Sequence, residues 1–378
     1  MTRNSADVAI VGGGIIGCAL ARELAGRGAR VTILEREEPG AEASGAAAGM
    51  LAPQAEGLPP GPLFDLALES RSLYPAWTAA LAEEAGIDAG YRRSGILRCA
   101  FPEGPAGVEP PRWQSARGLA VEEKDAGEIA GLTRGAASNR IRSGVFFPDD
   151  GVVDNAKLTR ALWKSCELRG VTFALGKTAL RFALSGARCV GVQTDGGLIE
   201  APQVVNAAGA WASFDAAFPI PVEPVRGQIV EIEAPEPVLP SVVWSHEVYV
   251  VPRADTWLLG STMERVGFQK RVTAGAVERL VAAAARLLPG VDKSAFLRAW
   301  AGLRPGTPDE LPLLGVTSVP GLFLATGHFR NGILLAPVTA LALADELSGG
   351  RTHDLAPFSP ARFSKNGFPG RHPATLLG

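Results

Sequence analysis

A glycine-rich segment near the N-terminus carries the first residues whose types and spacing could do chemistry. Residues 12–17 read Gly-Gly-Gly-Ile-Ile-Gly and match the pattern G-x-G-x-x-G. In this pattern the glycines permit a tight turn, a close approach of the backbone to a pyrophosphate and close packing of a helix on a strand. A helix that starts here offers unpaired N–H groups to phosphates. The pattern therefore predicts a dinucleotide site, provided that it lies between a strand and a helix.

The residues on either side of the glycines supply these two elements. Residues 7–11 predict a buried strand, and the apolar spacing over residues 16–24 predicts a helix that ends near Gly26 or Gly28. A second strand is predicted from residue 29 to Glu35. Strand, helix and strand in about thirty residues form a βαβ unit, which implies a parallel sheet. A carboxylate at this position accepts hydrogen bonds from a ribose and disfavours a 2′-phosphate, which leaves FAD and NAD open and argues against NADP.

Composition excludes several other classes of protein. A formal net charge of −2 over 378 residues gives no basic patch for nucleic acid or for a membrane surface. The four cysteines lie far apart without a C-x-x-C pair, and the four histidines form no ligand cluster. We therefore expect free thiols in a reducing cytoplasm and no metal site. A secretory leader is not expected, because cleavage after the first apolar run would remove the glycine motif, and no run is long enough for a spanning helix.

A second segment, residues 44–53, consists largely of Ala and Gly. Such small side chains let the backbone come very close to something flat or bulky. A helix that starts near Ser44 would also offer a second set of free amides to the pyrophosphate.

A third segment, residues 327–334, reads Gly-His-Phe-Arg-Asn-Gly-Ile-Leu and joins an apolar strand at residues 322–325 to a helix. A helix N-terminus carries roughly half a positive charge. Directed at the N1–C2 carbonyl edge of a flavin, it would stabilise the anion that forms on two-electron reduction.

A fourth segment, residues 299–307, places Arg304 among apolar and rigid neighbours. A lone arginine is usually solvated, but a guanidinium between Leu303 and Pro305 is well suited to hold a carboxylate through two hydrogen bonds.

The rest of the chain predicts a mixed architecture. Helices are expected at residues 63–85, 154–168, 273–288 and 333–347, and strands at 171–174, 189–194, 201–208, 225–232, 246–252 and 256–261. Residues 102–112 predict a loop. The pattern indicates an α/β plus α+β fold, in which a dinucleotide-binding sheet is combined with a second, mostly antiparallel sheet.

Taken together, the segments resemble the D-amino-acid-oxidase-like flavoproteins, and among these most the thiamine-biosynthetic glycine oxidases. The resemblance covers residues 7–347 and rests on Ala-Ala-Gly-Met-Leu at residues 47–51, Ala-Gly-Leu-Arg-Pro-Gly-Thr at 301–307 and Gly-His-Phe-Arg-Asn-Gly-Ile-Leu-Leu-Ala-Pro at 327–337. It implies noncovalent FAD in a Rossmann-like, glutathione-reductase-like domain. We expect residues 1–80, 141–215 and 297–365 to form that domain, residues 81–140 and 216–296 to form the substrate domain, and residues 366–378 to form a loose tail.

The resemblance also implies roles for individual residues. The expected FAD-binding residues are Gly12, Gly13, Gly14, Ile15, Ile16, Gly17, Glu35, Arg36, Ser44, Ala46, Ala47, Ala48, Gly49, Met50, Ala179, Ala208, Gly209, His328, Phe329, Asn331, Gly332, Ile333 and Leu334. The expected substrate-binding residues are Arg304, Arg330, Tyr249 and Met263. The chain departs from the family near Tyr249: Glu247 stands where the family often has histidine, and His246 is shifted by one position. Substrate preference at that edge stays open.

The activity implied is oxidative deamination of glycine or another small amino acid or amine. A hydride passes from Cα to flavin N5 without an obligatory general base, and O2 is reduced to hydrogen peroxide. The resemblance further implies self-association, which is frequent in this fold, and functional coupling to thiazole synthase. Four alternatives stay open: a quinone- or dye-linked D-amino-acid dehydrogenase, a sarcosine or secondary-amine oxidase, an NAD-dependent dehydrogenase and a flavin-binding module without activity.

Overall fold

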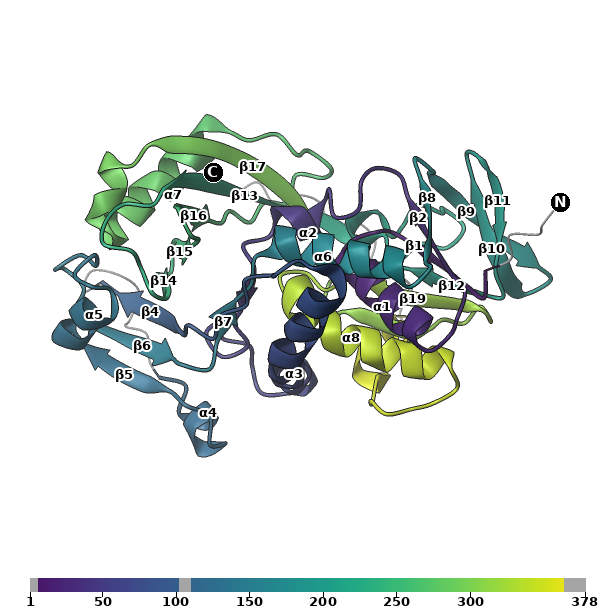
Figure 1. Ribbon diagram of the computed structural model, residues 1–378, viewed down its shortest axis with the longest axis horizontal. Coiled ribbons are helices and arrows are strands. Elements are labelled where there is room, and N and C mark those ends of the chain that lie inside the picture. Colours follow the sequence, from purple (N-terminus) through teal and green to yellow (C-terminus); the bar gives the residue numbers. More distant parts are fainter. Residues whose placement is uncertain (1–5, 102–109, 364–378) are drawn as a thin grey trace.

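Two large β-sheets lie toward opposite ends of the molecule, with helices between and around them (Figure 1). The computed structural model describes residues 6–101 and 110–363. The fold is mixed α/β, as the sequence predicts, with one sheet that is mostly parallel and one that is mostly antiparallel. In the described ranges no helix is both long and apolar enough to cross a membrane.

The mostly parallel sheet has six strands and contains the predicted βαβ unit. Its order is β18 (Leu313–Val316), β19 (Leu322–Thr326), β12 (Gln203–Asn206), β1 (Val8–Val11), β2 (Val31–Glu35) and β8 (Thr172–Leu175). Strands β19 to β8 run parallel, and β18 alone pairs in the antiparallel direction. Parallel strands bury both faces, which explains the continuous apolar runs that made β1, β2 and β12 recognisable.

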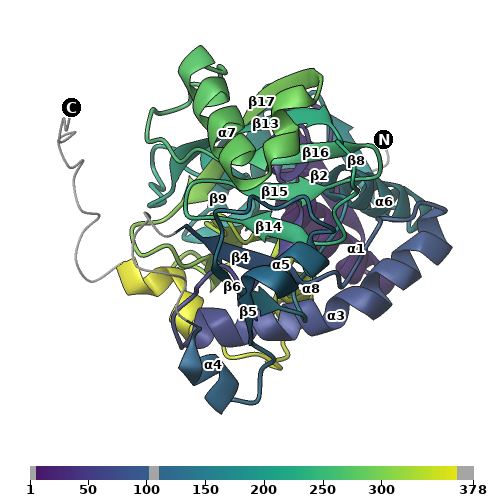
Figure 2. The ribbon, with the colours of Figure 1, turned by 90° about the vertical axis from the view of Figure 1, so that its left-hand side faces the viewer.

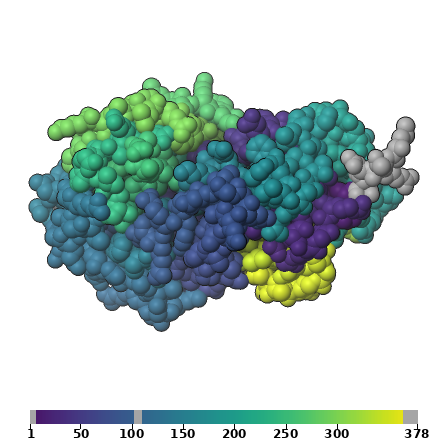
Figure 3. Space-filling view, viewed as in Figure 1, coloured from purple at the N-terminus to yellow at the C-terminus, as the bar shows by residue number. Residues whose placement is uncertain are grey.

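Helices cover one face of this sheet. They are α1 (Ile15–Gly26), α3 (Pro62–Ala85), α6 (Asn155–Leu168) and α8 (Gly332–Leu347), which share one apolar core. Local residues set their ends: Asp154 caps α6 by accepting a hydrogen bond from the Lys157 N–H at 3.0 Å, and Gly86 ends α3 with a φ of 69°. Figure 3 shows the N-terminal and C-terminal parts of the chain side by side at the surface, as the packing of α1 on α8 requires.

A small antiparallel sheet covers the other face. It consists of β9 (Ala179–Ser185), β10 (Arg188–Thr194) and β11 (Gly197–Glu200). Phe182, Cys189 and Val192 pack from it against Ala9 and Val204 of the parallel sheet. The six-stranded sheet therefore lies between a layer of helices and the small antiparallel sheet, and the three together form three layers.

The second large sheet has eight strands. Its order is β17 (Phe296–Gly306), β13 (Glu223–Glu233), β16 (Thr256–Gly260), β15 (Tyr249–Pro252), β14 (Val242–Trp244), β4 (Ile96–Ala100), β6 (Ser143–Phe147) and β5 (Glu122–Asp125). Only β14 and β4 pair in parallel. Helix α7 (Ala274–Leu287) packs on β13 and β16, and Figure 2 shows it lying across the face of the sheet.

Shorter elements make up the rest of the secondary structure in the part of the chain that the structure describes. They are α2 (Ala43–Ala46), β3 (Met50–Leu51), β7 (Gly151–Val152), α4 (Arg112–Ala116), α5 (Ala126–Leu132) and four 3-10 turns, η1 (Gly209–Trp211), η2 (Pro289–Lys293), η3 (Ala356–Phe358) and η4 (Pro360–Phe363). The one-turn helix α2 confirms the helix expected near Ser44.

Two predicted strands extend too far. The strand expected over residues 246–252 begins only at Tyr249, because Ser245 N–H bonds to the Val248 carbonyl at 2.9 Å and closes a turn. The strand expected over residues 201–208 ends at Asn206. Most of the predicted loop at 102–112, and the tail at 366–378, lie outside the described residues.

The division into two domains stays a prediction. The strand pairing bears on this prediction. The expected nucleotide domain includes residues 141–215 and 297–365, and therefore nearly all of β6 and β17, but both strands belong to the eight-stranded sheet.

Candidate functional site

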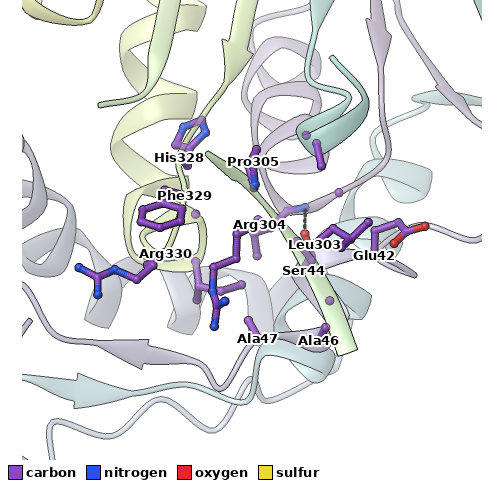
Figure 4. Close-up of a pocket in the computed structure, with 18 of the residues that line it drawn as sticks. Glu42, Ser44, Ala46, Ala47, Leu303, Arg304, Pro305, His328, Phe329 and Arg330 are labelled. Atoms are coloured by element: carbon purple, nitrogen blue, oxygen red, sulfur yellow. Dashed lines mark hydrogen bonds between the residues drawn. The ribbon is translucent and has the colours of Figure 1, made fainter. Parts of the chain in front are cut away.

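A cavity of about 490 Å³ lies between the two large sheets and takes its lining from both. The nucleotide sheet contributes the turns after β1, β2, β12 and β19, and the eight-stranded sheet contributes β13, β15, β16 and β17. Figure 4 shows Arg304 on β17 and the residues His328–Arg330, on the turn that leads into α8, gathered at this cavity. Its volume is within the usual range for ligand sites.

The glycine turn has the geometry that its sequence predicts. Gly12 has a φ of 109°, and a Cβ there would lie 2.5 Å from the Ala207 carbonyl oxygen. A Cβ on Gly17 would collide with the Gly12 carbonyl oxygen, so this glycine lets α1 pack closely on β1. Glu35 Oε2 accepts a hydrogen bond from the Gly13 N–H at 2.8 Å, which places the carboxylate beside the start of α1.

The α2 segment is clamped against β17 of the other sheet. Trp300 Nε1 donates a hydrogen bond to the Ala46 carbonyl at 3.0 Å. A Cβ on Gly302 would lie 2.5 Å from the Cβ of Ala46, so both positions need small residues for this approach. Ser44 Oγ accepts the N–H of Ile15 at 2.9 Å and thereby joins α2 to the start of α1.

A buried arginine holds the same segment from a third side. Arg253 donates to the carbonyls of Ala48 and Val153, each at 2.9 Å, and to Asn155 Oδ1 at 3.0 Å. Burial lowers the pKa of Arg253 from its usual value, and the neighbouring Arg92 lowers it further. Gly49 has a φ of 77° and no room for a Cβ beside Val153. The small-residue segment is therefore fixed by contacts with protein on one side and faces the cavity on the other.

The turn before α8 contains a neutral histidine. His328 is buried, its Nε2 lies 3.1 Å from Thr339 Oγ1, and burial lowers its pKa to about 3. The imidazole is thus uncharged at neutral pH and adds no charge to the partial positive charge of the helix N-terminus. Phe329 has a φ of 49°, which is rare for a bulky residue, and its N–H bonds to the Pro305 carbonyl at 3.1 Å. These contacts fix the backbone where α8 meets the cavity.

Arg304 reaches into the cavity from β17 and is held by neutral groups. Its Nη2 donates to Ser261 Oγ at 2.7 Å and its Nη1 to the Thr262 carbonyl at 3.1 Å. Its guanidinium lies over Gly227 of β13, where any Cβ would collide with it. Burial lowers the pKa of Arg304, and the neighbouring Arg330 lowers it further. A half-buried cation that has no carboxylate in hydrogen-bonding contact among residues 6–101 and 110–363 is suited to bind an anion.

Tyr249 lies beside Arg304. The Tyr249 hydroxyl contacts the Arg304 guanidinium, and burial raises the pKa of the phenol. Gly260 lies under the ring, since a Cβ there would be 2.5 Å from the hydroxyl oxygen. The phenol is therefore a neutral hydrogen-bonding group at the same end of the cavity as Arg304.

Arg330 has a carboxylate partner that the sequence analysis did not identify. Its Nε lies 2.8 Å from Glu56 Oε1, and the Glu56 side chain is 8% exposed. Burial raises the pKa of Glu56, while Arg330, Arg304 and Arg98 favour its charged form. An acidic residue in a loop is usually solvated, so no local pattern marks Glu56 as part of the site.

The comparisons with known proteins agree with this geometry. The family model described as "DAO: FAD dependent oxidoreductase" matches residues 7–346. The chain belongs to this DAO family of FAD dependent oxidoreductases.

Individual relatives cover nearly all of the chain. It is 38% identical over 365 residues to a glycine oxidase of Geobacillus kaustophilus, covering 94% of this chain and 97% of that one. The crystal structure of glycine oxidase from Geobacillus kaustophilus superposes with a TM-score of 0.88 at 36% identity, covering 95% of this chain and 99% of that chain. The chain is also 39% identical over 379 residues to the bifunctional protein ThiO/ThiG of Trichormus variabilis, covering 97% of this chain but only 56% of that protein. It thus spans about half the length of its bifunctional relatives.

The cavity of this DAO-family chain fits FAD. The N-termini of α1 and α8 both open on it, so backbone N–H groups and helix dipoles point toward a ligand from two places. Glu35 lines it beside the first of these, where a ribose hydroxyl needs an acceptor. The small residues of the α2 segment leave space along its wall.

Most of the predicted residues line this cavity. They are Gly12, Gly14, Ile15, Ile16, Glu35, Arg36, Ser44, Ala46, Ala47, Ala48, Gly49, Met50, Ala179, Ala208, Gly209, His328, Phe329, Asn331, Gly332, Ile333, Arg304, Arg330, Tyr249 and Met263. Gly13, Gly17 and Leu334 are absent from its lining. Gly13 and Gly17 shape the glycine turn, and the Leu334 carbonyl accepts a hydrogen bond from Ser70 Oγ at 2.6 Å within the core.

The structure also shows where His246 and Glu247 lie, the two positions at which the chain departs from its family. His246 and Glu247 line the cavity on the turn before β15, and Glu247 forms an ion pair with Arg286 of α7. Met263 lines the cavity as well, but it is 57% exposed and therefore lies at the mouth.

Proposed function

We propose that the chain is an oxidase of glycine and related small amino acids or amines, with O2 as the electron acceptor and hydrogen peroxide as product. The observation that carries the proposal is the anchoring of Arg304 in the cavity by neutral partners, which leaves its charge for a substrate carboxylate. The 38% identity to a glycine oxidase over 94% of the chain supports glycine as the leading substrate.

Arg304 and Tyr249 bind the substrate in this proposal. The guanidinium takes the carboxylate, the phenol of Tyr249 adds a hydrogen bond, and Met263 and Arg330 border the space for the rest of the molecule. Bound FAD would supply the acceptor for the Cα hydride and the route by which two electrons reach O2. Fixing the carboxylate at one end aligns the Cα–H bond, and such positioning supplies much of the rate enhancement.

No protein group is needed as a general base. His328 is buried and neutral and lies beside Thr339, and Tyr249 has a raised pKa. The reaction therefore begins from substrate whose amine is neutral. Exclusion of water by the cavity walls strengthens the contact between Arg304 and the carboxylate.

The FAD-binding roles predicted from the sequence belong to the same proposal. The start of α1 would hold the pyrophosphate, Glu35 the ribose, and the start of α8 the flavin edge. Bifunctional ThiO/ThiG relatives support a further proposal, that the imine product is passed to thiazole synthase in thiamine biosynthesis. The cytoplasmic location remains a prediction from the sequence.

The test is an anaerobic reduction experiment. The purified holoprotein is mixed with glycine, sarcosine, D-alanine and D-proline, and the flavin absorbance is followed in a stopped-flow instrument. Rapid bleaching by glycine, followed by rapid reoxidation with O2 and formation of peroxide, is expected. Bleaching only by the secondary amines would indicate a sarcosine-type oxidase instead.

A dehydrogenase is the second candidate, and it predicts a different result. Its reduced flavin would react slowly with O2 and rapidly with a quinone or dye. Absence of bleaching by any small amine would contradict both candidates and leave a flavin-binding module.

A further inference from the structure

Glu56 is a buried carboxylate at the substrate end that the proposed mechanism does not use. It lines the cavity and lies 2.8 Å from Arg330 Nε. Three guanidinium groups, those of Arg330, Arg304 and Arg98, act on its charge, and Glu310 acts in the opposite direction. A carboxylate in such surroundings changes the charge that a ligand meets.

The position of Glu56 is fixed by its own loop. Its N–H bonds to the Ala52 carbonyl at 2.9 Å, and the preceding Ala55 N–H bonds to Asp150 Oδ2 at 2.8 Å. Asp150 is fully buried and accepts a second bond from Arg71 Nη1 at 2.6 Å. The backbone of Glu56 is therefore held in place before any ligand arrives.

The two arginines at the substrate end of the cavity, Arg304 and Arg330, differ in what compensates their charge. Arg304 contacts the hydroxyl of Ser261 and the carbonyl of Thr262, both of which are neutral. Arg330 is paired with Glu56. Among the described residues, Arg304 thus has no carboxylate in direct contact, whereas the charge of Arg330 is compensated by Glu56.

A substrate with two anionic groups would meet this arrangement unfavourably. Its first carboxylate would occupy Arg304, and its second would approach a guanidinium that is already neutralised and a carboxylate of like charge. Like charges repel more strongly in a buried cavity than in water. Such a repulsion is large enough to discriminate between substrate classes.

We infer that Glu56 restricts the cavity to substrates with a single anionic group, because it neutralises Arg330. The inference rests on the proposed function, since it assumes that Arg304 binds the substrate carboxylate. It assigns to Glu56 a role in specificity rather than in the transfer of hydride.

The experiment measures ligand binding to the holoprotein without turnover. Acetate and malonate are titrated separately, and the perturbation of the flavin absorbance gives each Kd. In Glu56→Gln the Kd of malonate should fall at least about tenfold, while the Kd of acetate should change less than about threefold. Glu56→Ala, which also removes the charge, should shift the malonate Kd in the same direction.

Two further variants test whether the effect comes from the ion pair between Glu56 and Arg330 or from the loss of any negative charge near the cavity. Adding Arg330→Met to Glu56→Gln should abolish the gain for malonate, because the freed cation is lost. Glu247→Gln removes a negative charge from the same cavity but from a residue paired with Arg286, and it should leave the ratio of the two Kd values within about threefold. An unchanged malonate Kd in both Glu56 variants, or an equal gain in Glu247→Gln, would overturn the inference.

The outcome is distinguishable from the test of the proposed function. Failure of glycine to bleach the flavin would refute the proposed substrate and leave the titration result intact. Failure of the titration would leave glycine oxidation intact and remove only the role of Glu56.

Discussion

The guanidinium of Arg304 occupies the space above Gly227, where any other residue would place a Cβ. The two residues lie on neighbouring strands, β17 and β13, where Arg304 is opposite Val225 and Gly227 is opposite Gly302. The position of the substrate anchor therefore depends on the absence of a side chain at Gly227.

Gly227→Ala should displace Arg304 and weaken substrate binding. A misplacement of about 1 Å can cost about 10²-fold, so kcat/KM for glycine should fall by roughly that factor while the FAD content stays the same. Steady-state peroxide assays measure the first and absorbance ratios the second. Gly131→Ala, in the exposed helix α5 where a Cβ meets nothing, is the control and should be neutral. Normal activity of Gly227→Ala would show that the anchor tolerates the shift.

Arg304→Ala should remove the contact with the carboxylate. Loss of a desolvated charge partner costs about 3–5 kcal/mol, which corresponds to roughly 10²- to 10⁴-fold in kcat/KM. The same assay with glycine checks this. A loss of less than threefold, with FAD still bound, would refute the role given to Arg304.

His328 should make stability depend on pH. Its folded pKa of about 3 lies below the ordinary value of 6.5, so below pH 6.5 the unfolded chain binds a proton that the folded chain does not. The contribution is fully present above pH 6.5 and is lost as the pH falls toward 3, by about 2 kcal/mol between pH 7 and pH 5. His328→Gln should lose this part of the pH dependence. Urea unfolding of both proteins at pH 7 and pH 5, with saturating FAD, measures the difference, and equal pH dependence would contradict the assignment.

Arg253→Met should weaken the FAD site from a distance. The substitution leaves the carbonyls of Ala48 and Val153 without their donor, and each buried orphan costs about 1–3 kcal/mol. We expect a lower free energy of unfolding together with a larger Kd for FAD, measured by urea unfolding and by fluorescence titration. Arg286→Met, in a surface ion pair, is the matched control and should change stability by less than about 1 kcal/mol. If Arg253→Met changes stability and the Kd for FAD no more than the control does, Arg253 does not stabilise the FAD site.

Glu35→Gln should raise the Kd of FAD about tenfold, because a hydrogen bond to a charged acceptor is replaced by a neutral one. Ultrafiltration of the purified protein, followed by absorbance, measures the bound FAD. Glu37→Gln changes a nearby carboxylate that is absent from the cavity lining and should have no effect. Equal FAD loss in both variants would mean that net charge, rather than the contact of Glu35, matters.

The parts of the fold with local signals could be predicted from the sequence. The strand–glycine–helix unit at residues 8–35 follows from periodicity and from backbone freedom at Gly12, and the structure confirms it. The helix after Asn331 was predictable for the same reason, since an apolar strand, a polar turn and an apolar run have distinct patterns.

The parts of the site that depend on pairing across the sheets could not be predicted. Gly227, Gly260 and Glu56 carry no local pattern, and their roles exist only because β13, β16 and a loop bring them to Arg304, Tyr249 and Arg330. The strand predicted over residues 246–252 begins too early for the same reason. The hydrogen bond that closes the turn at Ser245 leaves no sign in the alternation of side chains.

Strand β17 carries Trp300, Gly302 and Arg304 at alternate positions. Trp300 binds the Ala46 carbonyl, and Gly302 leaves room for the Ala46 side chain. Arg304 is the proposed substrate anchor. Alternate positions of a strand share one side of the sheet, and a slip of one residue would present Leu303 instead. Deletion of a single residue in β17 would therefore disrupt both the contacts with Ala46 and the position of Arg304. A point substitution around the cavity changes one contact, whereas an insertion or deletion in β17 changes all three together.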